Sequence, residues 1–224
     1  MTYSEWKKSL LQNGVSVIAL EGNIGVGKTS LARMLARHLG ARLVEERVED
    51  NPFLERFYED MGSFRLQTQL VFLLNRYKQQ IALVQKELFD ELTVIDYIFA
   101  RDKIFAHVNL GDDELGLYNR IAQELEARVV KPDLVIYLQA RSDVLFERIQ
   151  RRGRPLERTV SKDYLETLNE AFNHYFFNYD ETPLLVVNTD SMDFVNNEKH
   201  FRDLAKRISE PVVGMEFYVP SWEG

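Results

Sequence analysis

The chain contains the stretch Gly22-Asn23-Ile24-Gly25-Val26-Gly27-Lys28-Thr29, which has the pattern G-x-x-x-x-G-K-[ST]. An apolar run precedes it at residues 15–20, and a helical stretch follows at residues 30–39 and stops at Gly40. A strand before these glycines and a helix after them form the context in which this pattern binds phosphate. The sequence therefore predicts a loop that binds a nucleoside triphosphate.

Each part of this octapeptide has an expected task. Glycines let the backbone curve so that successive N–H groups point at phosphate oxygens, and the N-terminus of the following helix adds partial positive charge. We expect Lys28 to reach the outer phosphates and the Thr29 hydroxyl to ligate Mg²⁺. The alternative is a glycine-rich turn without a ligand, but four fixed positions with these flanks argue against it. All of residues 22–29 are thus candidate ATP-binding residues.

The composition is that of one ordinary globular domain spanning residues 1–224. Hydrophobic residues make up 45% of the chain, enough to bury a core without disulfides or metals. The absence of cysteine excludes disulfides and thiolate zinc sites. Because neither a signal peptide nor a membrane-spanning stretch is recognisable, we expect a cytoplasmic protein without a membrane partner. A net charge of −7 argues against a nucleic-acid partner.

Short apolar runs alternate with helical patterns along the chain. Strands are expected at residues 15–20, 41–45, 92–96, 134–138 and 184–188. A short helix or arm is expected at residues 1–14, and a helix is expected to start at residues 51–52 and to continue over 53–58. Further helices are expected at about 30–39, 64–88, 101–107, 112–128, 141–151, 163–179 and 198–209. Such strands are typical of a parallel sheet covered on both faces. The sequence therefore predicts an α/β domain of the P-loop NTPase fold with a five-stranded sheet, and leaves residues 211–224 unassigned.

Acidic residues follow two of the expected strands, at the edge where such sheets bind ligands. Asp96 ends one strand and could hold Mg²⁺, or could cap a helix. Glu45 and Glu46 end another, where a carboxylate could accept the proton of an attacking hydroxyl. The alternative for this pair is a solvated acidic run that continues to Glu49 and Asp50.

A basic segment stands out in this acidic protein, with arginines at positions 148, 151, 152, 154 and 158. Arg148 and Arg152 share one face of a helix, and Gly153 and Pro155 break that helix where a mobile flap would begin. Guanidinium groups suit phosphate oxygens, so an arginine-rich lid at about 148–160 would stabilise a transferring phosphoryl group and exclude water. A solvated helix end is the alternative, but beside a phosphate-binding loop we favour the lid.

In their order along residues 15–190, these motifs resemble those of the deoxyribonucleoside kinases, especially the bacterial deoxyadenosine/deoxyguanosine kinase branch. The segment Glu46-Arg47-Val48-Glu49 resembles the family's E-P-V-E, whose first Glu activates the nucleoside 5′-hydroxyl. The resemblance thus implies Glu46 rather than Glu45 as the base. It also implies that Tyr58 and Glu157 bind the sugar 3′-hydroxyl.

The resemblance extends to residues that would contact the base. Gln69 and Arg76 lie seven residues apart on one helix face and look like the family's base-reading pair, although alone they would be ordinary surface residues. Asp102 resembles the acid that pairs with that Arg, and Phe105 the ring that stacks on the base. The segment 148–157, R-I-Q-R-R-G-R-P-L-E, is similar to the family lid.

One triplet departs from the family pattern. Most members carry an acid, an Arg and a Ser or Thr after the third strand, whereas this chain has Asp96-Tyr97-Ile98. The family Arg helps to orient the catalytic Glu, the 5′-hydroxyl and the phosphates. We therefore predict that Arg101, one helical turn beyond Tyr97, supplies the missing charge. Arg47 in place of the family Pro is a milder difference.

The residues and the resemblance together predict an ATP-dependent deoxynucleoside kinase, which transfers the γ-phosphoryl group of ATP–Mg²⁺ to the 5′-hydroxyl of a deoxynucleoside. The branch implies a purine substrate. The expected catalytic residues are Glu46, Lys28, Arg148, Arg152 and Arg101. Arg148, Arg152 and Arg154 are also expected to bind ATP, and the expected Mg²⁺ ligands are Thr29 and Asp96.

Two alternatives stay open. A nucleoside monophosphate kinase would need a cationic pocket for the acceptor phosphate, whereas the expected acceptor residues are mostly neutral or acidic, with Arg76 the exception. A non-catalytic relative would be expected to lose Lys28, Glu46 or the arginines of the lid, and all are present. The resemblance also implies a homodimer and a place in nucleotide salvage.

Overall fold

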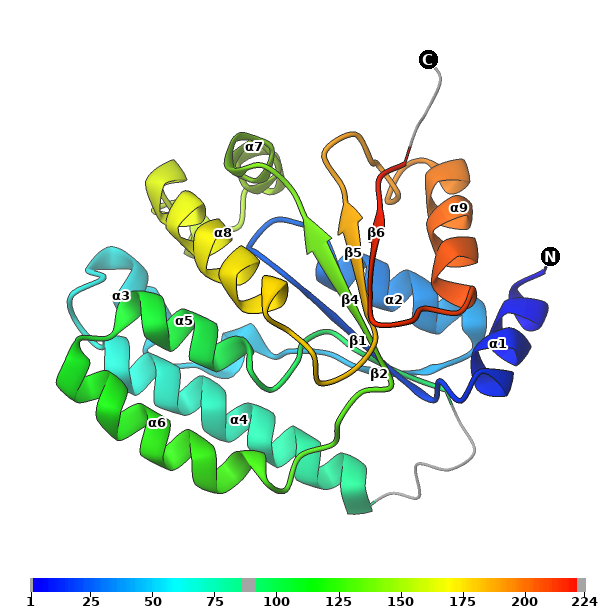
Figure 1. Cartoon of the computed structure of the whole chain (residues 1–224). Coiled ribbons are helices and arrows are strands. Elements are labelled where there is room, and N and C mark those ends of the chain that lie inside the picture. The colour runs from blue at the N-terminus through cyan, green and yellow to red at the C-terminus, as the bar shows by residue number, and fades with distance from the viewer. Residues whose placement is uncertain (1, 86–91, 221–224) are drawn as a thin grey trace.

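The computed structural model describes residues 2–85 and 92–220. Its centre is a parallel sheet with the strand order β2-β3-β1-β4-β5-β6 (Figure 1). In chain order the strands are β1 (Val17–Gly22), β2 (Arg42–Val44), β3 (Thr93–Ile95), β4 (Leu134–Gln139), β5 (Leu184–Asn188) and β6 (Met215–Tyr218). Ile18 of the central strand lies opposite both Val94 and Leu134. The predicted parallel α/β fold is confirmed.

The prediction of five strands was wrong by one, because β6 comes from the unassigned tail. This strand pairs with β5 and lies at the edge of the sheet. Phe217 is 66% exposed, and the other three residues of β6 are only partly buried. An edge strand with solvent beside it does not need an all-apolar sequence. The search for short apolar runs, which identified the buried strands, therefore could not identify β6.

The helices lie close to their expected positions. They are α1 (Tyr3–Gln12), α2 (Lys28–Leu39), α3 (Leu54–Glu59), α4 (Arg65–Gln85), α5 (Arg101–Asn109), α6 (Asp112–Glu126), α7 (Ser142–Arg152), α8 (Lys162–Phe177) and α9 (Glu198–Ser209), with short 3₁₀ turns η1 (Val48–Asp50) and η2 (Pro155–Glu157). The predicted end of the long helix at residues 86–88 lies outside the described residues. Among the described helices, none is long and apolar enough to cross a membrane.

Helices cover both faces of the sheet and enclose two main apolar cores (Figure 1). On one face α1, α2 and α9 bury residues such as Trp6, Leu35 and Leu204. On the other face α4, α5 and α8 pack against the sheet, with Ile104 and Phe172 fully or nearly buried. A smaller cluster joins α4 and α5 to the outer helix α6. Burial of these apolar faces from water holds the layers together.

The strand order brings the candidate residues together. Because β3 lies between β2 and β1, the segments that leave the carboxyl ends of these three strands are neighbours. They carry Glu46, Asp96 and the glycine-rich loop at residues 22–29. A parallel sheet therefore delivers a base, a candidate metal ligand and a phosphate loop to one edge.

Candidate active site

The loop at residues 22–29 has the shape that its glycines permit. Gly22 and Gly27 have φ angles of 146° and 108°, which disfavour other residues. A Cβ atom on Gly22 would lie 2.4 Å from the carbonyl oxygen of Leu138, and one on Gly27 would lie 2.7 Å from the ring of Phe194. The loop can therefore curl only with glycine at these positions.

The loop ends at the N-terminus of α2, which is suited to an anion. No side chain of the described residues caps this helix at Gly27. Lys28 is nearly buried, and its Nζ donates to the carbonyl oxygens of Gly22, at 2.7 Å, and Asn23, at 3.2 Å. The first N–H groups of α2, the positive end of its dipole and the ammonium group of Lys28 are thus gathered at the loop.

Thr29 and Asp96 meet beside this loop, as predicted for a pair of Mg²⁺ ligands. The Thr29 hydroxyl donates to Oδ2 of Asp96 at 2.6 Å, whereas the buried Oδ1 has no hydrogen-bond partner in the described part of the chain. Burial raises the pKa of Asp96 to about 6, although the nearby charge of Lys28 opposes this rise. The described residues hold no cluster of three acidic or His side chains for a metal. Two oxygen ligands fit Mg²⁺, which usually keeps several waters and substrate phosphates in its shell.

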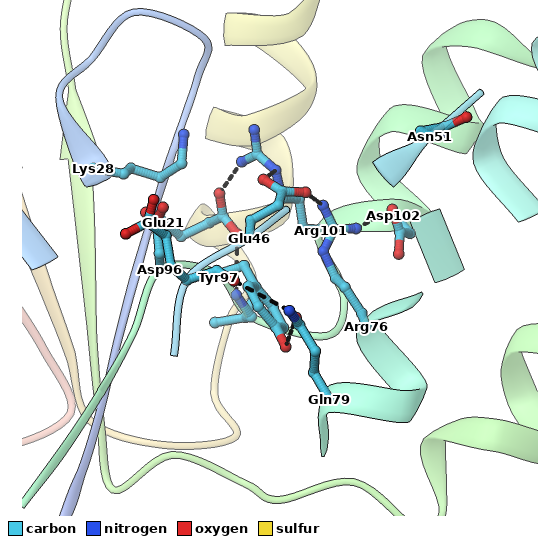
Figure 2. Close-up of polar contacts among 12 residues, drawn as sticks. Glu21, Lys28, Glu46, Asn51, Arg76, Gln79, Asp96, Tyr97, Arg101 and Asp102 are labelled. Atoms are coloured by element: carbon cyan, nitrogen blue, oxygen red, sulfur yellow. Dashed lines mark hydrogen bonds and ion pairs between the residues drawn. The ribbon is translucent and has the colours of Figure 1, made fainter. Parts of the chain in front are cut away.

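Buried side chains of alternating charge extend from this region toward α4 and α5 (Figure 2). Arg76 forms ion pairs with Glu46 and with Asp102. Arg101 pairs with Glu21, and its Nε lies 3.6 Å from Oε2 of Glu46. Arg101 also donates to the carbonyl oxygen of Gly22 at 2.9 Å. Glu46 is therefore held between two arginines that are themselves anchored on other acids.

The arginines determine the charge state of Glu46. Burial alone would raise the pKa of this carboxyl, but the charges of Arg76, Arg101 and Lys28 outweigh burial and hold the pKa below its ordinary value. Glu46 is thus ionised at neutral pH and able to accept a proton. For Asp102 the balance is reversed: burial outweighs the charge of Arg76 and raises the pKa of this carboxyl to about 6.

Most of the predicted residues line one cavity, which we call the inner cavity. Its walls include Lys28, Thr29, Glu46, Tyr58, Gln69, Arg76, Arg101, Asp102, Phe105, Arg152, Arg154 and Glu157. Oε1 of Gln69 and Oδ2 of Asp102 are buried, and neither has a hydrogen-bond partner among residues 2–85 and 92–220. Buried polar atoms without partners are costly, so these acceptors indicate a bound ligand with hydrogen-bond donors.

The arginine-rich segment divides between two places. Arg152 donates through Nε and Nη2 to the carboxylate of Glu157. Arg152 was expected to bind phosphate and Glu157 the sugar 3′-hydroxyl, but here the two residues pair with each other. Arg154 lines the inner cavity beside them. Arg148 instead donates to the carbonyl oxygens of Thr189, at 2.6 Å, and Met192, at 3.1 Å. The contact of Arg148 with phosphate therefore stays a prediction.

A second opening, which we call the outer cleft, was not predicted from the sequence. It has a volume of about 630 Å³ and lies between the phosphate loop, α7 and the segment after β5. Its walls include Gly25, Ser30, Arg148, Arg151, Asp190 and Phe194. The segment at residues 189–196 has no phosphate-type or catalytic motif, so only the fold places it next to the loop.

Other residues of the site also lacked a sequence signal. Glu21 is completely buried and accepts hydrogen bonds from the N–H groups of Gly22 and Ile98. An acid at the end of an apolar strand gives no sign that it will anchor an arginine. Tyr164 lines the inner cavity and donates to Asn109, but its position on α8 resembles that of other aromatic core residues.

Several known proteins are similar to this chain in sequence and in fold. A family model described as deoxynucleoside kinase matches residues 18–213. A deoxyguanosine kinase of Bacillus subtilis (strain 168) is 36% identical over 206 residues, covering 90% of this chain and 100% of that protein. A deoxyadenosine kinase of Lactobacillus acidophilus is 31% identical over 212 residues, covering 88% and 96%. The solved structure of deoxyadenosine kinase from M. mycoides with bound dATP has a TM-score of 0.75 and 25% identity, covering 87% of this chain and 100% of that one.

Proposed function

The chain belongs to the deoxynucleoside kinase family, and we propose that it phosphorylates purine deoxynucleosides at the 5′-hydroxyl with ATP as donor and Glu46 as base. The observation that carries this proposal is the position of Glu46. Its carboxylate is ionised, lies on the wall of the inner cavity and is held close to the loop of Lys28. A proton acceptor between a cavity lined by polar and aromatic side chains and a phosphate loop is what transfer to a hydroxyl requires.

In the proposed reaction, Glu46 accepts the proton of the 5′-hydroxyl as its oxygen attacks the γ-phosphorus of ATP. The new O–P bond forms as the bond between the γ-phosphorus and the bridging oxygen breaks, and ADP leaves. Lys28, Arg152 and Arg154 neutralise charge on the phosphoryl oxygens. Mg²⁺, held by Thr29 and Asp96, would supply further neutralisation of the phosphates. Catalysis is thus mainly positioning and electrostatic stabilisation.

The inner cavity is proposed to bind the deoxynucleoside. Tyr58 and Glu157, which both line it, are assigned to the sugar 3′-hydroxyl. Gln69 and Asp102 offer unpaired buried acceptors to a base edge, and Phe105 offers its ring for stacking. Because Glu157 is paired with Arg152, arrival of the sugar would have to rearrange this contact. The outer cleft, beside the same loop, is then the place for the donor nucleotide.

An acceptor panel tests this function directly. We would measure ATP-dependent phosphorylation of each of the four deoxynucleosides, and of dAMP and dTMP, with the same enzyme preparation. Turnover of one or both purine deoxynucleosides is the expected result. Turnover of monophosphates only would overturn the acceptor assignment, and ATP binding without turnover of any acceptor would indicate a non-catalytic relative.

Substitution of Asp96 by Asn is expected to raise the stability of the ligand-free protein near neutral pH and to weaken its use of Mg²⁺. The pKa of Asp96 is raised from 3.8 to about 6 in the fold, so its stabilising contribution is present below pH 3.8 and is lost as the pH rises through 6. A neutral Asn avoids this loss, so ligand-free Asp96→Asn should melt higher than the wild type at about pH 7.5 but not at about pH 4. Its half-maximal Mg²⁺ concentration for turnover should rise at least about tenfold. Equal Mg²⁺ requirements in the two proteins would contradict the ligand assignment.

We also propose a homodimer that forms through α4 and α6, and a cytoplasmic role in nucleotide salvage. Leu74 on α4 is 44% exposed and Leu117 on α6 is 49% exposed, and these helices pack side by side. Exposed apolar side chains on adjacent helices suit an interface between copies. Sedimentation of the wild type and of Leu74→Glu tests the dimer, because a monomeric wild type or a dimeric variant would oppose it.

A further inference from the structure

Tyr97 is completely buried beside the site, and none of the roles assigned above uses it. Its hydroxyl donates to Oε1 of Gln79 at 2.8 Å, and Nε2 of Gln79 donates to the backbone carbonyl oxygen of Glu45 at 3.1 Å (Figure 2). This direction is unambiguous, because a carbonyl oxygen can only accept and the amide must then turn its own oxygen toward Tyr97. A hydrogen-bonded path therefore runs from Tyr97 through α4 to the residue before Glu46.

The backbone that this path reaches has little other support. Residues 45–47 have no regular secondary structure and connect β2 to η1. Among the described parts of the chain, no backbone–backbone hydrogen bond involves Glu46. The side chain of Glu45 turns away to pair with Arg33 on α2. The bond from Gln79 to the Glu45 carbonyl is thus a main constraint on where the backbone presents Glu46.

Tyr97 is also linked to the side chain of Glu46, through Arg76. Its ring centroid lies 5.3 Å from the guanidinium carbon of Arg76, within the range of a cation–π interaction. Arg76 in turn forms an ion pair with Glu46. Arg76 and Gln79 are three residues apart on α4 and so lie on the same helix face. One tyrosine therefore contacts both residues of α4 that hold Glu46.

We propose that Tyr97 is a positioning residue, which sets the approach of Glu46 to the 5′-hydroxyl through Gln79 on the backbone side and through Arg76 on the side-chain side. This inference rests on the proposed function of Glu46 as base. A path of this kind should affect the rate of the chemical step more than the binding of either substrate, because a small displacement of a catalytic group is costly for catalysis.

The test compares Tyr97→Phe, which keeps the ring and removes the hydroxyl, with Gln79→Leu and with the double variant. Tyr137→Phe is the matched control, since this buried hydroxyl donates to Asn173 at 2.8 Å outside the site. We expect each single variant of the path to lower kcat about tenfold while both KM values stay within about twofold. The double variant should be no slower than Gln79→Leu, and Tyr137→Phe should keep the wild-type kcat.

The pH profile adds a readout that a purely structural role would not change. If Glu46 shifts away from its arginines, its pKa rises. Asp96 and Asp102 also titrate in the acid range, so the readout is the difference from Tyr137→Phe: the acid limb of the kcat profile should move to higher pH in both path variants and not in this control. A kcat of Tyr97→Phe within about twofold of wild type, losses that multiply in the double variant, or an equal loss in Tyr137→Phe would each overturn the proposal. Full turnover by Glu46→Gln would instead show that the assignment of the base has failed, and the positioning role with it.

Discussion

Replacing Glu46 by Gln is expected to lower kcat by about 10²- to 10⁴-fold, the contribution typical of a general base. Gln has nearly the same shape as Glu and can still accept a hydrogen bond from Arg76, but it cannot take the proton of the 5′-hydroxyl. The KM for ATP should change little, because Glu46 does not line the outer cleft. Initial rates at saturating ATP and deoxynucleoside would measure the loss.

The adjacent residue supplies the control for this experiment. Glu45 carries the same functional group, but its side chain is 30% exposed and pairs with Arg33 at the surface. Glu45→Gln keeps the backbone carbonyl that Gln79 binds, so it should retain wild-type turnover. A large loss in Glu45→Gln combined with an active Glu46→Gln would reverse the assignment of the base.

Arg101→Ala is expected to damage both stability and turnover. Arg101 is 7% exposed, and its partner Glu21 is completely buried, so the substitution leaves an uncompensated charge in the core. Breaking a buried pair in this way typically costs about 3–5 kcal/mol of the free energy of unfolding. Glu46 also loses one of the two arginines that hold it, so kcat should fall at least about tenfold. Chemical denaturation and steady-state kinetics on the same preparation would measure both effects.

A double variant separates the two effects of Arg101. In Glu21→Gln combined with Arg101→Met, neither residue is charged and the volume is nearly kept, an exchange that is often neutral for stability. We expect this protein to regain most of the unfolding free energy but to remain slow. Recovery of full turnover would mean that Arg101 serves the fold alone, and an Arg101→Ala protein with unchanged turnover would refute its proposed compensation for Tyr97.

Site residues could be predicted from the sequence where they belong to a recognisable local motif. The loop at 22–29, Glu46, Gln69 and Arg76 could be placed because the spacing or the resemblance identified them, and the structure gathers them around one cavity. The strand β6 escaped because an edge strand needs no continuous apolar run.

Contacts made through the fold were harder to predict than the motifs themselves. Glu21 and Gln79 escaped because their importance arises from partners that are distant in the sequence, Arg101 and Tyr97. Arg148 was assigned to phosphate for the same reason: its bonds to Thr189 and Met192 depend on where the fold places the segment after β5, which the sequence does not reveal. Residue type alone indicated phosphate, whereas tertiary structure supplied competing backbone acceptors.

The position of β1 in the centre of the sheet has a consequence for biosynthesis. Ile18 pairs with Val94 on one side and with Leu134 on the other, so β1 is synthesised well before the two strands that cover its edges. Pairing between such distant segments is slow and leaves strand edges open in the meantime. The phosphate loop is therefore made early, whereas the inner cavity is complete only after Arg152, Arg154 and Glu157, which follow β4, have also been synthesised.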